Sequence, residues 1–116
     1  MPKKRKDVDY LEDIQEALCN IIEYIEGLTY EKFVLDKKTK DAVVHNLEII
    51  GEAVKALSNN IRNEYSYVPW KKLAGVRDRL IHSYFDINYE IVWNIIKNEL
   101  PRLLDQIREI LVALKH

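Results

Sequence analysis

The sequence has 116 residues, of which 47% are hydrophobic and 32% are charged, and its formal net charge is -1. This length and balance fit a single globular domain and exclude a disordered chain. The near-neutral net charge disfavours a protein that coats nucleic acid, because such proteins carry a large excess of basic residues. It is compatible with a small, locally basic site on an otherwise neutral protein.

The lone cysteine, Cys19, excludes an internal disulfide and suits a reducing cytosol. No apolar run approaches the about 20 residues that span a bilayer, and no signal-peptide pattern opens the sequence. We therefore expect a cytoplasmic protein with no membrane partner.

Residues 1–8 open the chain with a basic run, Lys3-Lys4-Arg5-Lys6. We interpret them as a flexible, solvated tail on one helical domain that covers residues 1–116. The alternative is an accessory contact to RNA.

Apolar residues recur at helical spacing along almost the whole chain, beginning with a helix from Leu11 to Ile25. Gly27 lies where a C-terminal cap would follow that helix. Thr29 is placed to cap a short second helix that contains Phe33.

A long third helix is expected from Val43 to Leu57, with Gly51 inside it. Because a glycine within a helix costs about 1 kcal/mol relative to alanine, Gly51 predicts the close approach of another backbone. Pro69 is placed as the first residue of a fourth helix, whose apolar residues continue to Tyr84.

The last predicted helix starts after a cap at Asn88 and runs to Leu114. Its apolar stripe keeps its phase across Pro101, so we expect one kinked helix there. No segment alternates strictly enough to predict a strand. The expected fold is all-α, an antiparallel bundle of four or five helices.

The densest polar cluster falls on the fourth predicted helix, where four cations lie within residues 71–79. Such a cluster on a nearly neutral protein is a phosphate-sized basic footprint, although an ordinary solvated helix face has the same composition. The polar residues of this segment are Lys71, Lys72, Arg77, Asp78, Arg79 and His82.

Helical spacing relates these residues to His82. Asp78 is four residues before His82, so on a helix the two share a face, and the carboxylate would fix the imidazole tautomer. Arg79 is three residues away and is also a neighbour. Arg77 is five residues away, about 140° around an ideal helix, so a long arginine must reach round or a second protomer must supply the missing group.

Other residues have plainer interpretations. Tyr84 lies on the apolar side of the predicted helix, as a core or interface tyrosine would. His45, Glu48 and Glu52 have a spacing that mimics part of a metal site, but no cysteine or second histidine joins them, so we interpret them as a solvated face. We expect no metal and no cofactor, because the sequence has no Gly-rich phosphate loop, paired-cysteine motif or nucleophile elbow.

The run Arg77-Asp78-Arg79-Leu80-Ile81-His82-Ser83-Tyr84 resembles the R-x4-H-x-Y signature of HepT toxins, which belong to the HEPN superfamily. The one departure is Asp78, where asparagine is common in the superfamily. The resemblance covers nearly the whole chain. It extends to Tyr10-Leu11-Glu12-Asp13-Ile14, Ala42-Val43, Asn46-Leu47-Glu48, Ile50-Gly51-Glu52-Ala53, Pro69-Trp70, Gly75 and Leu100-Pro101.

This resemblance implies a HEPN-like homodimer that acts as a metal-independent ribonuclease. His82 would take the proton from the RNA 2′-OH and Arg77 would hold the phosphate. Asp78 and Arg79 would support them, and Lys71 and Lys72 would bind RNA. The expected products are a 2′,3′-cyclic phosphate and a 5′-hydroxyl, and a two-fold dimer would bring two copies of His82 together as base and acid.

The family also implies a partner. HepT toxins pair with MntA, a minimal nucleotidyltransferase antitoxin of type VII toxin–antitoxin systems, which transfers AMP onto the motif tyrosine, here Tyr84. The expected substrate is tRNA. Two alternatives stay open: a non-catalytic nucleotide-binding helper subunit of a nucleotidyltransferase, and a plain structural dimerisation bundle.

Overall fold

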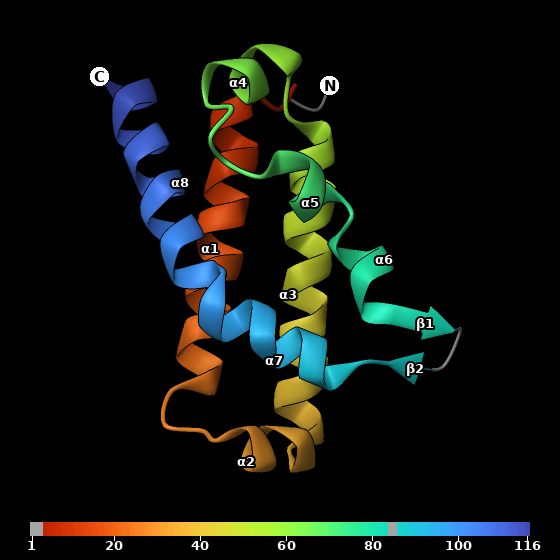
Figure 1. Ribbon diagram of the computed structural model, residues 1–116. Helices are drawn as coiled ribbons and strands as arrows, with labels where there is room; N and C mark the ends of the chain where they lie inside the picture. The colour runs from red at the N-terminus through yellow and green to blue at the C-terminus, as the bar shows by residue number, and fades with distance from the viewer. Residues whose placement is uncertain (1–3, 84–85) are drawn as a thin grey trace.

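The computed structural model describes residues 4–83 and 86–116, apart from the side chains of residues 81–83 (Figure 1). The chain is mainly helical, as predicted, and one small hairpin projects from it. The elements are α1 (Asp7–Ile25), α2 (Tyr30–Leu35), α3 (Lys37–Ala56), α4 (Asn59–Glu64), α5 (Trp70–Ala74), α6 (Val76–Leu80), β1 (Ile81–Ser83), β2 (Asp86–Ile87), α7 (Tyr89–Asn98) and α8 (Leu100–Lys115).

The long helices α1 and α3 lie side by side and antiparallel, and α8 packs against α1 (Figure 1). Their apolar stripes face one another, and each fully buried Leu or Ile side chain contributes about 1.5–3 kcal/mol relative to exposure. This confirms the all-α bundle. The fully buried residues of its centre include Leu11, Ile14, Leu18, Ile21, Val43, Val54, Ile107 and Ile110.

The predicted helix ends are confirmed at three positions. Gly27 follows α1 with a φ of 76°, a conformation that glycine adopts without strain. The Thr29 hydroxyl accepts a hydrogen bond from the Lys32 amide at 3.2 Å. The Asn88 side-chain oxygen accepts one from the Ile91 amide at 3.1 Å, which caps α7.

Gly51 permits the close backbone approach that the sequence predicted. A Cβ built on Gly51 would lie 3.3 Å from Cγ1 of Val76 and 3.4 Å from the carbonyl oxygen of Leu73. The α5–α6 segment therefore rests directly on α3, and no larger side chain fits between them without movement.

The prediction of one continuous fourth helix from Pro69 to Tyr84 is wrong. Gly75 separates α5 from α6, and the helix ends at Leu80, where strand β1 begins. The expectation of no strand is also wrong, because β1 pairs antiparallel with β2. The physical reason is the chain reversal between α6 and α7, which the amide of Asn88 closes by donating to the carbonyl of Leu80 at 2.9 Å.

The single kinked helix expected around Pro101 is two helices in the structure. Glu99 alone lies between the end of α7 and the start of α8. Proline has no N–H, and its ring clashes with the carbonyl four residues earlier, here that of Lys97, so the hydrogen-bond ladder breaks at this point.

The N-terminal tail is shorter than the predicted residues 1–8. Helix α1 begins at Asp7, and the Arg5 guanidinium donates to the Asp13 carboxylate at 2.7 Å. Residues 1–3 lie outside the described part of the chain. None of the helices described is long and apolar enough to cross a bilayer.

Candidate functional site

Helices α5 and α6 carry the polar cluster, and their apolar residues hold them on the bundle. The indole N–H of Trp70 donates to the carbonyl oxygen of Tyr65 at 3.0 Å, and Trp70 itself is buried. Leu73, Val76 and Leu80 are also buried. The packing of these residues against the core leaves Lys71, Lys72, Arg77 and Asp78 exposed to solvent, whereas Arg79 is half-buried.

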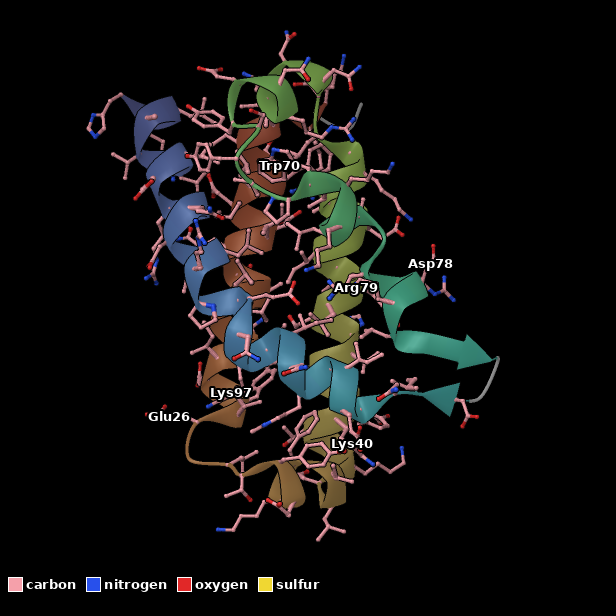
Figure 2. The ribbon with its side chains drawn as sticks, in the orientation of Figure 1. Glu26, Lys40, Trp70, Asp78, Arg79 and Lys97 are labelled. Carbon is pink, nitrogen blue, oxygen red and sulfur yellow. The ribbon has the colours of Figure 1, made fainter. Side chains whose placement is uncertain are left out.

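Arg77 and Asp78 are exposed on α6, and Asp78 points away from the bundle (Figure 2). Within the described part of the chain, neither side chain has a hydrogen bond or ion pair. A guanidinium with all its donors unused is well suited to a bidentate contact with a phosphate. The structure therefore presents the Arg77 guanidinium to solvent, and its predicted contact with a phosphate stays a prediction.

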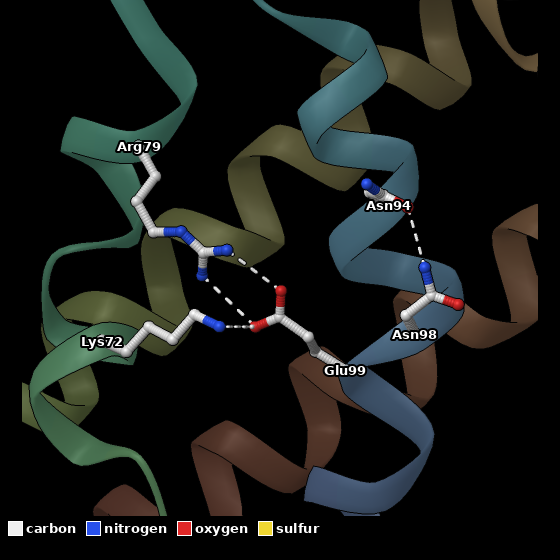
Figure 3. Close-up of polar contacts among 5 residues, drawn as sticks. All are labelled: Lys72, Arg79, Asn94, Asn98 and Glu99. Atoms are coloured by element: carbon white, nitrogen blue, oxygen red, sulfur yellow. Dashed lines mark hydrogen bonds and ion pairs between the residues drawn. The ribbon is translucent and has the colours of Figure 1, made fainter.

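Arg79 has a partner that helical spacing did not predict. Its guanidinium donates to both carboxylate oxygens of Glu99, at 3.3 Å from Nη1 to Oε1 and 3.0 Å from Nη2 to Oε2 (Figure 3). The ammonium of Lys72 lies 3.3 Å from Oε1 of the same carboxylate. Arg79 and Lys72 therefore both form ion pairs with Glu99 of the same chain.

Sequence reasoning missed Glu99. The residue is 20 positions from Arg79, so no local spacing connects the two. The available signal was Pro101, because a proline near Glu99 can interrupt a helix and change the direction of the side chains around it. Burial raises the pKa of the Glu99 carboxyl, but its hydrogen bonds and charge contacts with Arg79 and Lys72 outweigh burial and leave that pKa below its usual value.

His82 lies on strand β1 and not on the motif helix. The prediction that Asp78 and His82 share a helix face is therefore wrong, because the helix ends two residues before His82. The strand register shifts between the pairs Ile81↔Ile87 and Ser83↔Asp86, so His82 is the residue at the irregularity. Such bulges are common next to active sites.

The side chain of His82 and the whole of Tyr84 lie outside the described residues. The meeting of His82 with Arg77 therefore stays a prediction, as does the place of Tyr84. The structure does describe the backbone at His82. Strand β1 follows Leu80 directly, and His82 is its second residue, five positions after the exposed Arg77.

Lys71 and Lys72 both line one surface cavity, and Lys72 also lines a second. One, of about 580 Å³, also contacts Arg62. The other, of about 300 Å³, is lined by Lys72, Glu99 and Arg102. Arg62 and Arg102 thus add positive charge to this face, which the sequence did not single out because neither is near the motif.

His45 and Glu52 are exposed on α3, as the interpretation of a solvated face predicts, and Glu48 is partly buried. The three residues line a cavity of about 370 Å³ together with Asp13. Across residues 4–83 and 86–116, however, no three His, Cys, Asp or Glu side chains are arranged to hold a metal ion.

Comparison with known proteins gives matches over nearly the whole chain. The family model described as "Ribonuclease HepT-like" matches residues 14–110. A Methanocaldococcus jannaschii protein named "Putative RNase" is 49% identical over 112 residues, which cover 96% of this chain and 91% of that protein. A Caldanaerobacter subterraneus protein with the same description is 49% identical over 88% of this chain and 91% of its own.

A third relative, named "Probable ribonuclease HepT", comes from Thermococcus cleftensis. It is 43% identical over 100 residues, which cover 86% of this chain and 91% of the relative. No solved structure gives a significant match to the chain.

Proposed function

This chain belongs to the ribonuclease HepT-like family, and from that premise we propose that it is a metal-independent endoribonuclease that acts as a toxin. The observation that carries the proposal is the exposed Arg77 guanidinium, which has no hydrogen-bond or ion-pair partner among the described side chains and lies on a short helix that leads directly into the strand with His82. A phosphate ligand and a proton acceptor close together are the two groups that RNA cleavage requires.

The reaction uses the nucleophile that RNA itself carries. The His82 imidazole takes the proton from a 2′-OH, and the freed oxygen attacks the adjacent phosphorus. The bond to the 5′-oxygen breaks, that oxygen receives a proton, and the products are a 2′,3′-cyclic phosphate and a 5′-hydroxyl. Arg77 stabilises the charge that develops on the phosphate oxygens.

One imidazole cannot easily be base and acid in the same turnover. A two-fold homodimer that places two copies of His82 at one phosphate would supply both groups.

The test is incubation of the purified protein with total RNA and with tRNA, the substrate that we propose. Wild type should cleave, whereas His82→Ala and Arg77→Gln should each lose about 100-fold or more in kcat. Lys115→Gln, at the far end of α8, is the control for a lost positive charge. Nucleotide binding without cleavage by the wild type would instead favour the helper-subunit function.

We further propose that an MntA-type nucleotidyltransferase silences the toxin by AMPylation of Tyr84. A nucleotide two residues from His82 adds bulk and negative charge where the RNA phosphate must bind. On co-expression, mass spectrometry should find AMP on the Tyr84 peptide of wild type. Tyr84→Phe should carry no AMP and should stay toxic, whereas an unmodified wild-type peptide in a silenced pair would contradict this mechanism.

A further inference from the structure

Glu99 connects the α7–α8 junction to two consecutive short helices that lie about 20 residues earlier in the sequence. It is the single residue between α7 and α8, and its carboxylate contacts Arg79 of α6 and Lys72 of α5 (Figure 3). Both side chains of the Arg79–Glu99 pair are 29% exposed, so solvent screens this pair less than a fully exposed one.

Helices α5 and α6 need such a contact. Each has five residues, and Gly75 lies between them. Isolated helices of this length are not stable in water, so tertiary contacts must fix their orientation. The buried Val76 and Leu80 attach one side of α6 to the core, and the Arg79–Glu99 pair attaches the side that faces the α7–α8 junction.

We infer that Glu99 is a positioning residue of the proposed nuclease site: by holding Arg79, it fixes α6 in the orientation that presents Arg77 to the RNA phosphate. This inference rests on the proposed function. It also makes the supporting role of Arg79 specific, since the Arg79 guanidinium donates to both oxygens of the Glu99 carboxylate and thereby supports the site by its position.

Steady-state kinetics of two variants test the inference. Glu99→Gln and Arg79→Gln both break the pair, so each should lower kcat about tenfold through misplacement of Arg77. Their effects on KM should be opposite. Glu99→Gln removes a negative charge and lowers KM for RNA, whereas Arg79→Gln removes a positive charge and raises KM.

The double variant and a matched control complete the experiment. Because both residues act through one pair, the double variant should have a kcat no lower than either single variant. Glu109→Gln makes the same change from carboxylate to amide on the exposed side of α8 and should leave kcat unchanged. If Glu99→Gln keeps the wild-type kcat, or raises kcat/KM because the freed Arg79 binds phosphate, the inference is overturned.

Amide hydrogen exchange gives a measurement that does not depend on cleavage. In Glu99→Gln, the amides of α6 should exchange about tenfold faster, whereas those of α1 and α3 should not change. If the wild type cleaves no RNA, the proposed function fails, and exchange still decides whether Glu99 fixes α6. Unchanged exchange in α6 would overturn the positioning role even in an active nuclease.

Discussion

Three consecutive residues of α6 lie in two different environments. Arg77 and Asp78 are exposed, whereas Arg79 is half-buried against Glu99. Successive residues of a helix point about 100° apart, so one turn can offer a guanidinium to solvent and pair another inside the protein. The exposed Asp78 carboxylate, beside Arg77 in sequence, lowers the local positive potential and would weaken phosphate binding slightly.

The Glu99 carboxyl predicts how stability depends on pH. Its pKa in the folded protein lies below the ordinary value of 4.5, so the carboxylate stabilises the fold above about pH 4.5, and this contribution is lost as the pH falls through the folded pKa. Glu99→Gln lacks this contribution. Thermal unfolding should therefore show a lower Tm for the variant at pH 7, and the difference should shrink below pH 4.5. A difference that is equal at pH 7 and pH 3 would contradict the role of the charged pair.

At the scale of elements, the segment from α5 to β2 is held from two sides. Gly51 of α3 lets the backbone of α5 approach closely, and Glu99 contacts α5 and α6 from the α7–α8 junction. Between these supports, the chain leaves the helical conformation at Leu80 and continues as strand β1. The candidate site is therefore built on two short helices and a hairpin that neighbouring elements fix.

Substitutions at Gly51 should measure how tightly α5 and α6 rest on α3. A Cβ at this position lies 3.3 Å from Val76 Cγ1, so in Gly51→Ala the helix-propensity gain of about 1 kcal/mol and the crowding nearly cancel. Gly51→Val overfills the contact and should lower the free energy of unfolding by about 1–3 kcal/mol. Urea denaturation of both variants checks this, and equal stability of the two would mean that the contact is loose.

At the scale of the whole molecule, α1, α3 and α8 form the scaffold, and the hairpin of β1 and β2 projects on the side of the bundle away from the C-terminus (Figure 1). The proposed reaction also requires a dimer, because it needs a base and an acid and each protomer has only one His82. A shared site would make the dimer the unit of activity.

Mixing protomers tests whether the site is shared. After subunit exchange with excess His82→Ala, most wild-type protomers would pair with an inactive one, so activity per wild-type protomer should fall toward zero. Excess Lys115→Gln should leave it unchanged. Analytical ultracentrifugation establishes the dimer in both mixtures. Constant activity per wild-type protomer in the His82→Ala mixture would show that each site is complete in one subunit.

Local features of the sequence predicted most of the scaffold. Apolar spacing predicted the long helices. Residue type predicted the caps at Gly27, Thr29 and Asn88, because a cap depends on the conformation or hydrogen bonds of residues only a few positions apart. Gly51 predicted a close contact, because a glycine inside a helix is costly unless something needs the space. The family was recognised from the run between Arg77 and Tyr84 together with residues along the rest of the chain.

By itself, the sequence determined the helical class, the caps at Gly27, Thr29 and Asn88, and the family, since each depends on spacing and residue type along the chain. Only the tertiary structure decided that the motif segment ends as a helix at Leu80 and that Arg79 pairs with Glu99. The physical reason is that a five-residue helix has almost no stability of its own. Neighbouring elements set the length of this helix and the partners of its side chains, so the periodicity of the sequence does not predict either.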